Sequence, residues 1–155
     1  MRKLSIAAFA IVALAVCAEG PAGVEFFPGT QLKGYTKSLS PKINAQKVAT
    51  EQLAKWNNAS LMVAHREGDG EAELHMTQAD IMIIETGGGT LRMGGKVDNP
   101  RNTAANEVRG PSISGGEERK VAAGDIIHIP AKVPHQMRVA GGQQITYAIV
   151  KVDEK

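Results

Sequence analysis

Histidines, and the acidic residues close to them, are the side chains of this sequence best suited to chemistry. The chain of 155 residues has four histidines: His65, His75, His128 and His135. Glu73 lies two residues before His75 in a stretch expected to be a β-strand, where side chains at i and i+2 point to the same face. This spacing predicts two metal ligands from one strand, a carboxylate and an imidazole.

Asp80 and His135 could complete such a site. Asp80 begins the next expected strand, and a tight turn after His75 could bring its carboxylate to the same pocket. His135 follows the segment 130–134 (PAKVP), where a rigid turn could aim the imidazole inward. Two imidazoles with one or two carboxylates suit a first-row divalent metal, and Fe, Mn, Zn, Ni and Cu all remain open. Each residue alone is more simply explained as a polar side chain with an ordinary partner, so only the joint pattern indicates a metal site.

His128 lies in the expected strand 125–130 and could face either the pocket or the opposite side of the sheet. If it faces inward, it is a candidate for substrate binding, because imidazole titrates near neutrality. The alternative is a hydrogen-bonded strand histidine with no role in binding. No side chain of the sequence can be named as catalytic.

Short apolar segments separated by glycine-rich turns make up most of the chain after residue 59. Strands are expected at 60–64, 71–76, 80–86, 90–93, 118–122, 125–130, 135–140 and 144–152. The polar segment 96–112 is expected to be a long loop over one end of the domain. Short strands at this spacing predict an all-β sandwich or barrel.

The region before the strands has a different composition. Residues 19–42 are rich in Gly, Pro, Ser and Thr and are expected to form an extended leader. Between residues 45 and 56, Val48, Leu53 and Trp56 fall near one face of a helix, which predicts one short helix there. We therefore divide the chain into an N-terminal extension at 19–58, with a short helix, and a β-domain at 59–155.

Two segments of the sequence resemble the motifs of the cupin superfamily, G-(x)5-H-x-H-(x)3-4-E-(x)6-G and G-(x)5-P-x-G-(x)2-H-(x)3-N. The positions that correspond to the first are Glu73, His75, Asp80 and Gly87, and those that correspond to the second are Gly124, Pro130 and His135. The resemblance covers roughly residues 59–152. It implies a double-stranded β-helix, or jelly-roll barrel, in which Glu73, His75, Asp80 and His135 hold one divalent transition metal. It also implies a homodimer, because barrel edges in this family commonly pair between subunits.

The sequence departs from these motifs at five positions, and at one of them the first glycine of the first motif is out of register. Glu73 stands in place of the first histidine, Asp80 in place of glutamate, Lys132 in place of glycine and Val139 in place of asparagine. Aspartate is one methylene shorter than glutamate, so Asp80 could act on the ligands rather than on the metal itself.

The fold hosts many unrelated activities, so the resemblance alone leaves the function open. Metal-containing cupins include dioxygenases, isomerases and decarboxylases, which implies a metal-dependent enzyme of oxygenase or isomerase type with a small organic substrate. The alternative is a non-catalytic module that binds a small ligand such as a sugar or a carboxylate.

The first eighteen residues resemble a secretory signal peptide rather than part of the fold. A basic start is followed by an apolar run over 4–16, then by Cys17 and Ala18. The run is shorter than the roughly 20 residues that span a bilayer, so no membrane span is expected. We expect export to the periplasm or the medium. Lipidation of Cys17, the single cysteine, remains open, although Val16 is bulky where a small residue is usual.

Removal of that segment would leave a mature chain without net charge. The whole chain has 18 basic and 16 acidic residues, and the loss of Arg2 and Lys3 leaves 16 of each. A neutral domain has no general electrostatic attraction to nucleic acid, so the expected partner is a small molecule.

Overall fold

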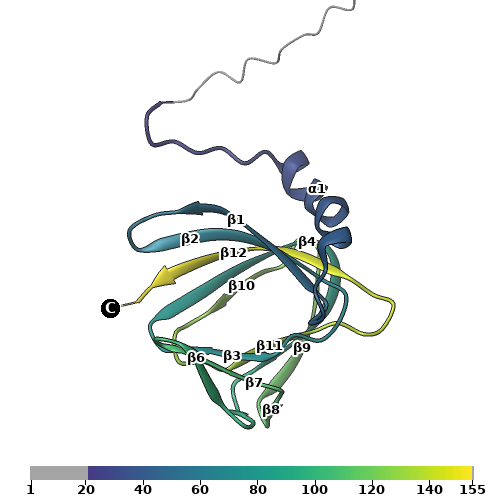
Figure 1. Cartoon of the computed structure of the whole chain (residues 1–155), viewed down its shortest axis with the longest axis vertical. Helices are drawn as coiled ribbons and strands as arrows, with labels where there is room; N and C mark the ends of the chain where they lie inside the picture. The colour runs from purple at the N-terminus through teal and green to yellow at the C-terminus, as the bar shows by residue number, and fades with distance from the viewer. Residues whose placement is uncertain (1–20, 155) are drawn as a thin grey trace, which may run out of the picture.

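The computed structural model describes residues 21–154 as a curled antiparallel sheet with one helix outside it (Figure 1). The elements are α1 (Gly29–Leu39), η1 (Ser40–Lys42), β1 (Val48–Lys55), β2 (Ala59–Arg66), β3 (Ala72–His75), β4 (Gln78–Met93), β5 (Lys96–Val97), β6 (Arg101–Ala104), β7 (Glu107–Gly110), β8 (Ile113–Ser114), β9 (Glu117–Ala122), β10 (Ile126–Ile129), β11 (His135–Arg138) and β12 (Ile145–Asp153). Ten strands form one sheet in the order β1-β2-β12-β4-β11-β3-β7-β6, with β9 and β10 also paired to β4. The predicted all-β barrel is confirmed.

The longest strand, β4, joins the two halves of the barrel. Its first part pairs with β12 and β10, and its second part pairs with β11 and β9. The prediction of two separate strands at 80–86 and 90–93 is therefore wrong, because the glycines at 87–89 bend the strand without ending it. Gly87 has a φ of 71°, and a Cβ there would lie 2.0 Å from the carbonyl oxygen of Gln144. Only glycine fits this close approach between β4 and the start of β12.

The predicted helix at 45–56 is wrong, because that segment forms strand β1 and pairs with β2 along its length. Apolar and polar residues alternate there with the period of a strand as well, and hydrogen bonds to β2 override the helical propensity. The short N-terminal helix is instead α1, in the segment expected to be an extended leader. Tyr35 and Leu39 of α1 are buried against Val63 and Ala148 on the outer face of the sheet, so packing rather than composition stabilises this helix.

The segment 96–112 is not one long loop, as we had expected. It contains β5, β6 and β7, and β7 pairs with β3 over four residues. This pairing sets Glu107 opposite His75 and Arg109 opposite Glu73. A polar hairpin thus lies beside the strand that carries two of the predicted ligands.

The main core lies between the two halves of the barrel and is built from residues of most of its long strands. Its largest fully buried members include Ile84, Leu91 and Ile145. A second cluster lies under α1, so β2 and β12 are covered on both faces. Such strands read as continuous apolar runs, which explains the sequence SLMVA at 60–64.

The expected strands at 60–64, 71–76, 118–122, 125–130, 135–140 and 144–152 correspond to β2, β3, β9, β10, β11 and β12. The predicted signal peptide at 1–18 lies outside the described residues. Within residues 21–154, no helix has the length and apolar character that a membrane crossing requires.

Candidate metal centre

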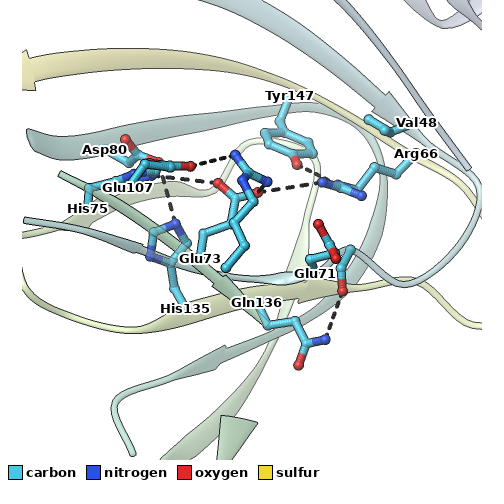
Figure 2. Close-up of polar contacts among 12 residues, drawn as sticks. Val48, Arg66, Glu71, Glu73, His75, Asp80, Glu107, His135, Gln136 and Tyr147 are labelled. Carbon is cyan, nitrogen blue, oxygen red and sulfur yellow. Dashed lines mark hydrogen bonds and ion pairs between the residues drawn. The ribbon is translucent and has the colours of Figure 1, made fainter. Parts of the chain in front are cut away.

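The four residues predicted to be metal ligands come together inside the barrel. Glu73 and His75 lie on β3, Asp80 lies near the start of β4, and His135 is the first residue of β11 (Figure 2). One ligand atom from each lies within 4.8 Å of the others. Three of these side chains are buried, and Glu73 is partly buried. The structure therefore brings together all four residues that the sequence singled out.

The two ring nitrogens that face the cluster, Nε2 of His75 and Nε2 of His135, are both oriented by a partner on the far side of the ring. His75 donates its Nδ1–H to the carboxylate of Glu107, and His135 donates its Nδ1–H to the carbonyl oxygen of Val133 at 3.1 Å. In a neutral ring held in this way, Nε2 presents its lone pair to the cluster. Nε2 of His135 is buried and has no hydrogen-bond partner among the described residues, so this donor set fits a metal ion.

Asp80 lies between the two imidazoles. Its Oδ2 is 3.3 Å from Nε2 of His75 and 3.5 Å from Nε2 of His135. Burial alone would raise the pKa of Asp80, but the two imidazoles and the ammonium group of Lys151 outweigh this effect and hold the pKa well below its usual range. The carboxylate is therefore ionised and available to a cation at any physiological pH.

Lys151, on β12, is a member of the cluster that sequence reasoning missed. Its Nζ lies 2.8 Å and 3.1 Å from the two carboxylate oxygens of Asp80 and 2.8 Å from Nε2 of His75. The ammonium group thus contacts two of the four predicted ligands. It provides a positive charge where Asp80 is cut off from water.

The protonation of His75 reflects these neighbours. Burial alone would lower its pKa, but hydrogen bonds to Asp80 and Glu107 raise the pKa to about 9, against the opposing charge of Lys151.

Two arginines surround Glu73, and neither was predicted. Arg109 donates a hydrogen bond to Oε1 of Glu73 at 2.9 Å and pairs with Glu107 at 2.7 Å. Arg66 lies 3.8 Å from the same Oε1 and donates from Nε to the hydroxyl of Tyr147 at 3.0 Å. The other oxygen of Glu73, Oε2, is 3.6 Å from Nε2 of His75, so this carboxylate keeps one oxygen for the cluster.

The site opens into a cavity of about 150 Å³. Glu73, Asp80, His135 and Lys151 line it together with apolar side chains such as Met62 and Met82 of the facing strands. The cavity can hold a small organic molecule beside the four-residue cluster.

The other two histidines lie elsewhere. His128 is exposed on β10 and lines a larger hollow of about 760 Å³ that none of the four cluster residues reaches. A role in binding substrate at the cluster therefore has no support from its position. His65 is buried on the outer side of the sheet, where its ring nitrogens bond to Thr146 and Glu67, so its role is structural.

The sequence carries only a partial signal for Glu107 and Arg109, that of a shared face on one strand. They alternate in the segment E-V-R, as Glu73 and His75 do in E-L-H, and that period is typical of two facing strands. Lys151 could not be identified from the sequence, because the residues around it do not predict the register of β12 against β4. That register sets Lys151 opposite Asp80.

Comparison with known proteins identifies the fold. No protein-family model matches the chain, and no curated protein sequence matches it. Among solved structures, TT1209 from Thermus thermophilus is 16% identical, with a TM-score of 0.55 over 77% of this chain and 94% of that one. A cupin-2 domain protein from Rhodospirillum rubrum is 18% identical, with a TM-score of 0.52 over 71% of this chain and 62% of that one. The polyketide cyclase RemF from Streptomyces resistomycificus is 16% identical, with a TM-score of 0.50 over 69% of this chain and 66% of that one.

At these identities the comparisons establish architecture and leave activity open. The curled antiparallel sheet, the bend of β4 between its two halves and the similarity to a cupin-2 domain agree with the resemblance seen in the sequence motifs. Residues 21–154 therefore have a cupin-type fold.

Proposed function

We propose that this protein binds one divalent transition metal through Glu73, His75, Asp80 and His135 and acts on a small organic substrate in the adjoining cavity. The convergence of four ligand atoms within 4.8 Å, with Nε2 of both imidazoles directed inward, is the observation that carries the proposal. When bound, such an ion acts as a Lewis acid on a substrate oxygen, which suits an enzyme of oxygenase or isomerase type.

The protein's own residues would prepare this site before a metal or substrate arrives. Glu107 holds the ring of His75, and the carbonyl group of Val133 holds the ring of His135. Apolar side chains in part of the cavity wall, such as Met62 and Met82, lower the local polarity, which strengthens electrostatic interactions in the site. Lys151 supplies a positive charge at the edge of the cluster and can donate a hydrogen bond to a substrate oxygen.

A non-catalytic ligand-binding module is the second candidate. The observation that favours it is the position of Lys151, whose ammonium group already compensates Asp80 and so allows the site to exist without a metal. A ligand that raises the melting temperature but is recovered unchanged after incubation with metal-loaded protein would support this candidate. Turnover of the ligand would support the enzyme.

Metal content is the first test of the proposal. Protein purified without added metal should contain close to one equivalent of a divalent transition metal by elemental analysis. Glu73→Ala and His135→Ala should each lose it while keeping the circular dichroism spectrum of a folded β-protein, because each removes one donor from a set of four. His128→Ala is the matched control and should keep the metal. Full occupancy in both ligand variants would show that the metal is bound elsewhere.

The bond from His75 to Glu107 provides a second test. Glu107→Gln should weaken metal binding by about ten- to a hundredfold, because the ring of His75 loses the anion that fixes its tautomer and raises its basicity. Competition with a fluorescent chelator measures this change. Glu71→Gln removes a carboxylate that pairs with Arg101 outside the cluster and should leave the affinity unchanged. Equal affinities in the two variants would contradict this role of Glu107.

Export and homodimer formation belong to the same proposal. Export is supported by the signal-peptide pattern at 1–18. Dimer formation is supported by the edge strands β9 and β10, which within residues 21–154 pair with β4 alone, and by the exposed Ile126 on β10. Protein recovered from the periplasm or medium should have lost residues 1–18 by mass spectrometry and should have twice the chain mass by light scattering. An uncleaved chain would contradict export, and a monomer would contradict the dimer.

A further inference from the structure

Apart from the two imidazoles, the cationic and anionic side chains around the cavity are equal in number. Three cationic side chains, Arg66, Arg109 and Lys151, face it. Three carboxylates contact these groups and belong to Glu73, Asp80 and Glu107. The phenol of Tyr147 adds no charge, because burial raises its pKa.

A divalent ion bound by the proposed ligands would upset this balance. The carboxylates of Glu73 and Asp80 would then be neutralised by the metal, and the cluster would carry two excess positive charges. Lys151 would lose its contacts with Asp80 and His75, because the metal takes their ligand atoms. Arg66 would keep Oε1 of Glu73 at 3.8 Å, but coordination of Oε2 would reduce the negative charge of that carboxylate. Arg66 is only 7% exposed, so this buried cation would favour a further anion in the cavity.

The position of Arg66 is built into the fold. A Cβ at residue 70 would lie 2.8 Å from its Cζ atom, so Gly70 makes the space that the guanidinium group occupies. Its Nε bonds to Tyr147, and its Nη2 faces Glu73. A planar guanidinium held in this way presents a fork that matches a carboxylate. Lys151 lines the same cavity, so two cations could reach one small ligand.

We propose that the ligand of the metal-loaded site is a small organic carboxylate, held by Arg66 and Lys151, and that it binds together with the metal rather than without it. This inference rests on the metal binding proposed above and names the substrate class of that site. It favours an organic acid over an uncharged sugar. The coupling is reciprocal, so the carboxylate also raises the affinity for the metal.

The test uses malonate, a small dicarboxylate, and malonamide, its uncharged analogue of similar shape. Both are titrated by calorimetry into metal-free and metal-loaded protein from which unbound metal has been removed, with the metal content measured before and after. Metal-loaded protein should bind malonate at least about tenfold more tightly than metal-free protein does, and at least about tenfold more tightly than it binds malonamide. Equal binding in either comparison would overturn the inference, and these arms depend on no variant.

The variant Lys151→Met then tests carboxylate binding separately from metal binding. This variant should keep the metal, because it removes no proposed ligand, but it should bind malonate at least about tenfold more weakly. Lys55→Met, at an exposed position of β1 outside the cavity, is the matched control and should behave as the unaltered protein. Lys151→Gln serves in its place if the methionine variant does not fold.

These measurements distinguish a failure of the proposed metal binding from a failure of the proposed carboxylate binding. Protein that takes up no metal contradicts the proposed function and, with it, the coupled binding of a carboxylate. Protein that binds metal but binds malonate equally well with Lys151→Met contradicts only the inference.

Discussion

A buried carboxylate, that of Asp80, is the constraint on which the rest of this site depends. It is 2% exposed, and a charge in that position must be compensated by nearby cations or hydrogen-bond donors. Strands from both halves of the barrel provide this compensation: His75 on β3, His135 on β11 and Lys151 on β12. The bend at Gly87 lets one strand, β4, pair in both halves, so the compensating groups meet at a single point inside the barrel.

The parts of this arrangement that could be predicted were those encoded by short-range spacing. The separation of Glu73 and His75 by two residues indicated a shared face. The expected turns before Asp80 and His135 made these two residues candidates, and the resemblance to the cupin motifs implied all four as one ligand set. Strand positions followed from alternating or continuous apolar segments between glycine turns. These features depend on neighbours within about ten residues along the chain, for which sequence periodicity is informative.

The parts that could not be predicted depend on pairing between distant segments. Lys151 reaches Asp80 only through the register of β12 on β4, and Glu107 reaches His75 only through that of β7 on β3. The helix predicted at 45–56 was wrong for the same reason. The apolar pattern of this segment fits both a helix and a strand, and hydrogen bonds to β2 favour the strand. Helix α1 was missed because its stability comes from contacts of Tyr35 and Leu39 with the sheet rather than from its own composition.

The position of a bound metal relative to Lys151 tests the central claim most directly. Crystals of the metal-loaded protein can be measured at the absorption edge of the metal, so that anomalous scattering locates the ion. The account predicts one strong peak at about 2.0–2.3 Å from Nε2 of both His75 and His135, with Nζ of Lys151 moved away from Asp80. A crystal with no peak in the cluster, and with Lys151 still bonded to Asp80 and His75, would contradict it.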